Sequence, residues 1–93
     1  SLVLDEPTNS LDLRAMHELR DAVRAIAQSG MSVILVTHHL PDIIPEIDRV
    51  ILLKKGRVVQ DGPKATVLTS GALTDLFGIP IEVVQRGDYY HAW

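Results

Sequence analysis

Residues 2–12 read Leu-Val-Leu-Asp-Glu-Pro-Thr-Asn-Ser-Leu-Asp, and this stretch decides the fold. Its three leading apolar residues indicate a short strand that is buried on both faces, and Asp5 and Glu6 follow it directly. Residues 7–10 have the composition of a turn. Asp12 then stands where a helix N-cap is expected. The stretch therefore predicts a strand that ends in two acids and leads, through a turn, into a helix.

The next segments complete one βαβ unit. Apolar residues recur at helical spacing after Asp12, at Met16, Leu19, Val23 and Ile26. Ser29-Gly30 is expected to end this helix. Residues 32–36 are an apolar, β-branched strand that leads into Thr37-His38-His39. A strand, a crossover helix and a second strand predict a parallel pair, so both strands should end at the same edge of the sheet, where open α/β sheets bind ligands.

The remaining chain is expected to form short helices and strands without an internal repeat. In chain order these are a helix over 41–47, a strand over 49–53, a hairpin partner over 57–60, a break at 61–63, one or two helices over 64–77 interrupted at Ser70-Gly71, and edge strands at 81–84 and 89–90 around a turn at 86–88.

Composition excludes several classes of protein. The 93 residues are 46% apolar, which is typical of a packed domain and argues against disorder. The net charge is −3 and no segment gathers Lys and Arg, so a nucleic-acid partner is not expected. The chain lacks cysteine, which excludes disulfides and Cys-ligated metals. Its apolar runs fall far short of the about 20 residues that span a bilayer.

Asp5, Glu6 and His38 are the candidate chemical residues. An Asp at a strand end can help to hold Mg²⁺ beside phosphates, and an adjacent acid can accept a proton from an attacking water. An imidazole on the neighbouring strand can donate a hydrogen bond to a phosphate. An isolated pair of acids after an apolar strand is more often merely solvated, so the pair gains meaning only from its surroundings.

Those surroundings resemble a known family. Residues 2–12 are similar to the Walker B motif and D-loop of ABC-type ATPases, and Thr37-His38 resembles their switch-histidine loop. Residues 47–62 also look like the family's strand and hairpin after that loop. The resemblance implies an α/β fold, a partial P-loop NTPase parallel sheet with crossover helices and a C-terminal hairpin. Residues 1–93 would then be the C-terminal part of one ABC ATPase domain.

The resemblance also implies roles. Asp5 would bind Mg²⁺ and nucleotide, Glu6 would be a catalytic residue, and His38 would be both catalytic and in contact with the γ-phosphate. The D-loop residues, which would lie at the interface with a second ATPase domain, are Ser10, Leu11 and Asp12. ATP and Mg²⁺ would be the ligands of the full-length protein. His39 receives no role, because the family often has an acid there.

The family's phosphate-binding segments are not among these residues. No G-x-x-x-x-G-K-[S/T] motif occurs, since the six glycines stand at 30, 56, 62, 71, 78 and 87. In the family this P-loop, the Gln loop and the signature segment precede Walker B, so we expect them before Ser1. Residues 1–93 alone are therefore expected to be inactive. With the P-loop strand absent between the His38 strand and the strand near 50–53, the exposed edges are expected to cause self-association.

Two functions from different classes remain. The first is the ATP-hydrolysing subunit of an ABC transporter, on the cytoplasmic face of the membrane and bound to permease subunits. The tail at 73–78 is similar to importers of metal chelates or oxyanions. The second is a soluble ABC ATPase of DNA repair or translation. A third, a binding-only descendant, is disfavoured because it needs neither a base nor a phosphate sensor.

Overall fold

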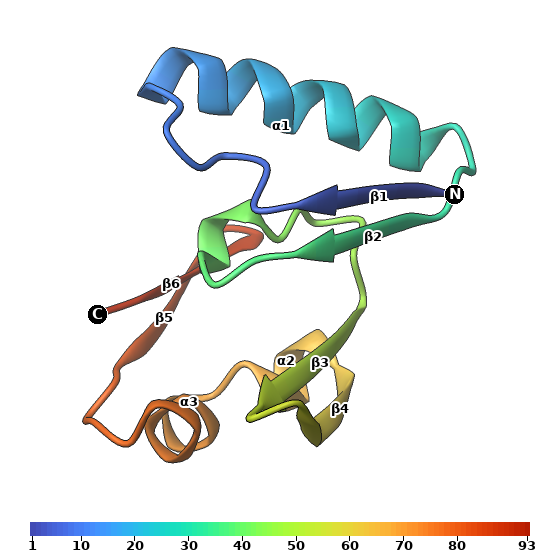
Figure 1. The fold of residues 1–93 in the computed structure, drawn as a ribbon. Coiled ribbons are helices and arrows are strands. Elements are labelled where there is room, and N and C mark those ends of the chain that lie inside the picture. Colours follow the sequence, from blue (N-terminus) through green and yellow to red (C-terminus); the bar gives the residue numbers. More distant parts are fainter.

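The computed structural model describes every residue from Ser1 to Trp93. Its elements form three separate two-stranded sheets with helices around them (Figure 1). In chain order they are β1 (Leu2–Asp5), α1 (Leu13–Gln28), β2 (Val33–Val36), the 3-10 helix η1 (Leu40–Asp42), β3 (Arg49–Lys54), β4 (Arg57–Pro63), α2 (Lys64–Val67), α3 (Ser70–Phe77), β5 (Val83–Arg86) and β6 (Tyr89–Ala92).

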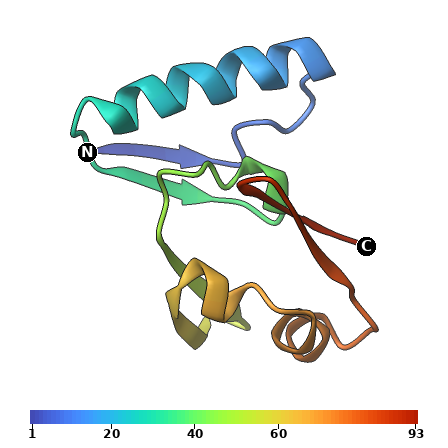
Figure 2. The same cartoon turned by 180° about the vertical axis from the view of Figure 1, so that it is seen from behind.

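The predicted βαβ unit is confirmed. Strands β1 and β2 are parallel neighbours, with Leu2 opposite Val33 and Asp5 opposite Val36. Helix α1 connects them and lies along both, which Figures 1 and 2 show from opposite sides. Asp12 caps this helix, because its Oδ1 accepts a hydrogen bond from the Ala15 backbone N–H at 2.8 Å. The two strands therefore end at one edge, as the sequence predicted.

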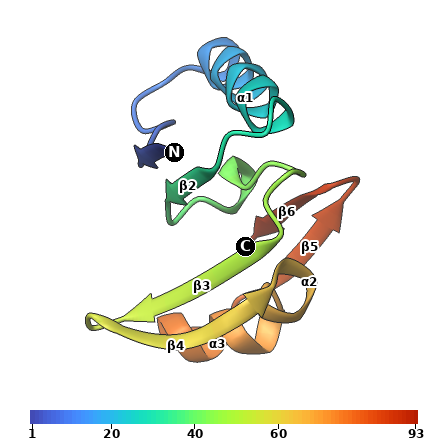
Figure 3. The ribbon, with the colours of Figure 1, turned by 90° about the vertical axis from the view of Figure 1, so that its right-hand side faces the viewer.

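The prediction that β1 is buried on both faces is wrong. Exposure alternates along both strands, and Val3 is 62%, Ile34 53% and Val36 50% exposed. The reason is that α1 covers only one face of the pair, as the end-on view in Figure 3 shows. An apolar run is fully buried only where layers lie on both faces, and here the second layer is missing.

The expected chain break at 61–63 is also wrong. These residues continue β4, whose register with β3 places Asp61 opposite Ile51 and Pro63 opposite Arg49. The guanidinium of Arg49 donates two hydrogen bonds to the Asp61 carboxylate, at 2.8 and 2.6 Å, and so ties the strands together. Pro63 is tolerated because it is the last residue of a strand that has a neighbour on one edge only.

Two predicted helices are shorter or shifted. Residues 41–47 do not form a helix, since η1 ends at Asp42 and the buried Ile43 and Ile44 follow it. Pro45 disfavours the helical conformation at the residue before it, which explains the early end. The break between α2 and α3 falls at Leu68-Thr69, before the predicted Ser70-Gly71, because the Thr69 hydroxyl caps α3 by accepting from the Ala72 N–H.

Most of the buried hydrophobic residues belong to two small clusters. One contains Ile43, Leu68 and Tyr90, and the other contains Leu52, Val67 and Leu73. The second hairpin, β5 and β6, has Val83 opposite Ala92 and reaches the first cluster through Tyr90. The sheets themselves are not joined: β2 is hydrogen-bonded only to β1, and β3 only to β4.

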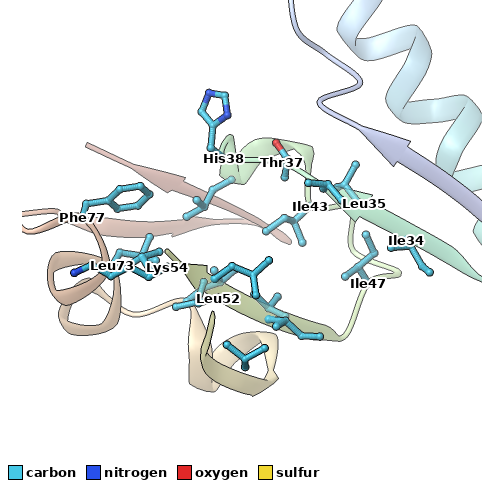
Figure 4. A pocket seen from close by; sticks show the side chains of 18 of the residues that line it. Ile34, Leu35, Thr37, His38, Ile43, Ile47, Leu52, Lys54, Leu73 and Phe77 are labelled. Atoms are coloured by element: carbon cyan, nitrogen blue, oxygen red, sulfur yellow. The ribbon is translucent and has the colours of Figure 1, made fainter. Parts of the chain in front are cut away.

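A cavity of about 690 Å³ lies between those two unjoined strands. Sixteen of its nineteen lining residues are hydrophobic. The lining includes all of β2 and the length of β3 from Val50 to Lys54. The close view in Figure 4 shows Ile34, Leu35 and Leu52 around it. The expected single parallel sheet is thus one parallel pair and two antiparallel hairpins, separated at this point.

Candidate functional site

Asp5 and Glu6 stand at the carboxyl end of β1. Asp5 is exposed and, by strand alternation, shares the face of Val3 that points away from α1. The backbone N–H of Glu6 still donates to the Val36 carbonyl at 2.7 Å, which extends the strand pairing by one residue. Glu6 then has a φ of +49°, an uncommon left-handed conformation for a residue with a side chain. The chain therefore turns sharply where the two acids are presented.

His38 meets Glu6 across the two strand ends. The imidazole Nδ1 lies 2.7 Å from Glu6 Oε1. The Glu6 side chain is 34% exposed and that of His38 78%, so the pair is open to solvent on its outer side. The structure thus brings together two of the predicted site residues that parallel strand pairing was expected to join.

The segment after Glu6 is held by its own turns. Asn9 N–H donates to the Glu6 carbonyl and Leu11 N–H to the Thr8 carbonyl, each at 3.1 Å. Ser10 has a φ of +67°, which completes the reversal before Asp12 caps α1. The three residues predicted to face a partner, Ser10, Leu11 and Asp12, are all exposed.

Sequence reasoning missed a third part of the site, the carboxylate of Asp42. Its Oδ1 accepts from the Thr8 hydroxyl at 2.7 Å, and its Oδ2 accepts from the Thr37 hydroxyl at 2.7 Å. His39 Nδ1 lies 3.0 Å from Oδ1. Burial alone would raise the pKa of Asp42, but the hydrogen bonds from His39, Thr37 and Thr8 outweigh it and hold that pKa below its ordinary value.

No simple sequence signal identifies this cluster. Thr8 belongs to the quoted turn, and Asp42 lies in a segment that was expected to be a helix. Only the three-dimensional approach of the two loops brings their side chains together. The available hint was a threonine close to each member of the Glu6–His38 pair, Thr8 two residues after Glu6 and Thr37 directly before His38, since hydroxyls commonly anchor loop backbones.

The cavity between β2 and β3 is not itself a phosphate site. Phosphate binding needs backbone N–H groups or cationic side chains, whereas this lining is mostly apolar and its one lysine, Lys54, donates to the Asp75 carbonyl at 3.3 Å. Thr37 and His38 lie at its rim, and Figure 4 shows the His38 ring pointing away from the apolar side chains. The chemical residues therefore border the cavity without filling it.

The relatives that comparison finds for this chain are ATP-binding proteins of transporters. No family model matches the chain. The hemin import ATP-binding protein HmuV of Photobacterium damselae subsp. damselae is 36% identical over 88 residues, which are 95% of this chain and 33% of that protein. HmuV of Bradyrhizobium diazoefficiens is 42% identical over 84 residues, 90% of this chain and 31% of the relative.

A Bacillus subtilis relative, the uncharacterized ABC transporter ATP-binding protein YlmA, is 38% identical over 94% of this chain and 34% of its own length. The part that matches in these relatives is their C-terminal region. The chain is homologous to ABC transporter ATP-binding proteins. It spans about a third of the length of the curated relatives that it matches.

A solved structure extends this ABC assignment to the fold. A transporter assigned to the metal-chelate type of ABC transporter, in an inward-facing conformation, matches 97% of this chain and 37% of its own with a TM-score of 0.74 and 28% identity. The chain therefore resembles ABC transporter proteins both in sequence and in fold. None of the helices in this chain is both long and apolar enough to cross a membrane.

The residues of this ABC homologue fit a Mg²⁺–nucleotide site better than a protein-only metal site. No group of three or more His, Cys, Asp or Glu side chains is arranged to hold a metal. Mg²⁺ in nucleotide sites commonly takes one or two carboxylates and completes its shell with waters and phosphate oxygens. The exposed carboxylate of Asp5 at the strand end suits that arrangement.

Proposed function

We propose that residues 1–93 supply the half of an ATP site that faces Mg²⁺ and water, within the ATP-hydrolysing subunit of an ABC transporter. The observation that supports this most is the 2.7 Å contact between Glu6 and His38. It places an acid and an imidazole at the carboxyl edge of a parallel strand pair, where α/β folds bind ligands. The homology to ABC ATP-binding proteins agrees with this assignment.

Glu6 is the proposed general base. Its Oε1 is engaged with His38 Nδ1, which orients the carboxylate and leaves Oε2 to accept a hydrogen bond from water. As that water attacks the γ-phosphorus of ATP, its proton passes to the carboxylate and the bond to the bridging oxygen breaks, with ADP leaving. At 34% exposure, the Glu6 side chain remains reachable by solvent water.

His38 is the proposed contact to the γ-phosphate. With Nδ1 held by Glu6, Nε2 is the ring nitrogen that can face the nucleotide. An imidazolium donates from both nitrogens, so it can keep the bond to Glu6 while it donates from Nε2 to a phosphate oxygen. The His38 imidazole would in this way contact both Glu6 and the γ-phosphate.

Asp5 is the proposed Mg²⁺ ligand. Bound Mg²⁺ neutralises charge on the β- and γ-phosphates during hydrolysis. The carboxylate of Asp5 is exposed beside Glu6, and the Glu6–Val36 backbone hydrogen bond holds the strand end that carries it. Asp5 thus contributes a fixed negative charge at the place where the metal–nucleotide complex is expected.

The phosphate-binding amides and lysine are proposed to come from residues outside these 93, because no G-x-x-x-x-G-K-[S/T] motif occurs among them. We propose that the strand carrying them lies between β2 and β3. The unpaired facing edges and the apolar cavity between them support this position. On this proposal residues 1–93 alone do not turn over ATP.

The transporter is proposed to be an importer of metal chelates. Two relatives are named for hemin import, and the structural neighbour is of the metal-chelate type, which supports this class over oxyanions. The subunit would work on the cytoplasmic face with membrane permease subunits. Ser10, Leu11 and Asp12, which are exposed, would contact a second ATPase domain.

The deciding experiment uses the full-length gene product. Purified alone and with its permease in vesicles loaded with hemin or buffer, it should hydrolyse ATP in a Mg²⁺-dependent way. Hemin transport that requires ATP would support the importer class. A folded product that lacks hydrolysis with Mg²⁺ in both preparations would refute the ATPase role, whereas hydrolysis without transport of hemin or another chelate would refute only the importer class.

A further inference from the structure

Asp42 is the one charged residue of the chain that is buried. It is the last residue of η1, six positions after β2 ends, and its side chain is 1% exposed. A buried carboxylate is costly unless hydrogen bonds compensate for the lost water. The three bonds it accepts, from Thr8, Thr37 and His39, supply that compensation.

The partners of Asp42 belong to the two loops that carry the proposed chemistry. Thr8 is two residues after Glu6, and Thr37 directly precedes His38. One carboxylate therefore holds both loops by side-chain hydrogen bonds of 2.7 Å, one to each of its oxygens. Apart from the Glu6–His38 contact itself, Thr8–Asp42 is the side-chain bond that joins the β1 loop to the segment after β2.

Thr8 is also part of the turn that leads to the exposed residues 9–12. Its carbonyl accepts from the Leu11 N–H at 3.1 Å, so a displacement of Leu11 moves Thr8. Asp42 would pass that displacement to Thr37, whose hydroxyl it holds, and thus to the neighbouring His38. The contacts between Leu11 and His38 thus run through the turn at Thr8, the buried carboxylate of Asp42 and the end of β2 at Thr37.

We propose that Asp42 is a positioning residue that sets the Glu6–His38 geometry and links residues 9–12 to the imidazole. This deepens the proposed function, because it makes hydrolysis sensitive to contact at the predicted dimer interface. A residue that only filled the core would contribute to stability but would leave His38 independent of Thr8.

Matched threonine variants of the full-length gene product test the catalytic part. Thr37→Val removes the hydroxyl and keeps the shape, whereas Thr37→Ser keeps the hydroxyl. We expect kcat for ATP hydrolysis to fall about 10- to 100-fold in Thr37→Val, with the KM for ATP nearly unchanged, and to stay near wild type in Thr37→Ser. Equal kcat values per folded molecule in the two variants would overturn the positioning role.

A second measurement does not depend on ATP hydrolysis. The ¹⁵N shifts of the His38 imidazole, assigned with a His38→Gln reference, report its contact with Glu6. Thr8→Val should shift them, Thr8→Ser should not, and Thr8→Val should add little once Thr37→Val is present. An unchanged His38 signal in folded Thr8→Val would refute the link. If the protein lacks ATPase activity but shows these shifts, the proposed function fails while the positioning role stands.

Discussion

The imidazole of His38 lies 2.7 Å from the carboxylate of Glu6, although 32 positions separate them in the chain. The contact follows from the parallel register, which sets Asp5 opposite Val36 and so brings the next residues of both strands to one edge. On the proposed function, the carboxylate would accept the proton of the attacking water while the imidazole contacts the γ-phosphate.

Glu6→Gln should abolish hydrolysis in the full-length product while it preserves ATP binding. The amide oxygen can still accept from His38, but it cannot take up a proton, so we expect kcat to fall by at least about 100-fold. Steady-state hydrolysis and equilibrium binding of ATP measure the two effects. Glu18→Gln is the matched control, since Glu18 is exposed on α1 and pairs only with Arg14. Equal losses in both variants would contradict a catalytic role for Glu6.

His38→Ala should also lower kcat, and the loss should not add to that of Glu6→Gln. Groups that act as a unit show this non-additivity, because removal of either one disables the same step. His17→Ala, an exposed histidine on α1, is expected to behave like wild type. If the double variant multiplies the two single losses, Glu6 and His38 act independently and the contact between them has no catalytic meaning.

A polypeptide of residues 1–93 should self-associate and should not hydrolyse ATP. The unpaired edges of β2 and β3 and the apolar cavity between them favour strand addition from another copy. Sedimentation should show concentration-dependent oligomers, and Ile34→Lys should reduce them because a charge on the exposed face opposes pairing. A monomer at all concentrations, with the β2 amides protected from hydrogen exchange, would contradict this expectation.

Acid should weaken the folded state through the Arg24–Glu46 pair. Hydrogen bonds from Arg24, at 2.9 and 3.0 Å, and from Gln28 lower the pKa of Glu46 from 4.5 to about 2. The unfolded chain then takes up this proton more readily than the folded chain. The stabilisation is therefore complete above about pH 4.5 and is lost as the pH falls toward about 2.

Urea unfolding of the full-length product at several pH values between about 5 and about 3 measures that loss. Glu46→Gln should reduce the pH dependence of the free energy of unfolding within this window, because residue 46 then has no proton to gain, whereas Asp42 and Asp61, whose pKa values are also lowered, keep theirs. Glu82→Gln, an exposed acid outside the ion pairs, should leave it unchanged. The same slope in all three proteins would show that the pair does not stabilise the fold.

The sequence predicted the parts of the molecule that depend on local pattern. The apolar runs and helical spacing of residues 2–36 were enough for the parallel pair, and Asp12 caps α1 as expected. The exposure of Val3 and Ile34 could not be predicted, because it depends on which layers cover the sheet. The Asp42 contacts depend on the approach of two loops, and the continuation of β4 through Pro63 depends on its edge position. These are tertiary effects without a periodic signature.

The crossover unit of residues 1–38 has a consequence for how the site is built during synthesis. Pairing of β1 with β2 is parallel and spans the whole of α1, so it is slower than helix or hairpin formation, but it needs no residue beyond the end of β2. The side chains of Glu6 and His38 would come into contact before the C-terminal hairpins emerge from the ribosome. Substitutions in those later hairpins would thus act mainly on the yield of assembled protein, and they would reach the site through Tyr90, which packs with Ile43 beside Asp42.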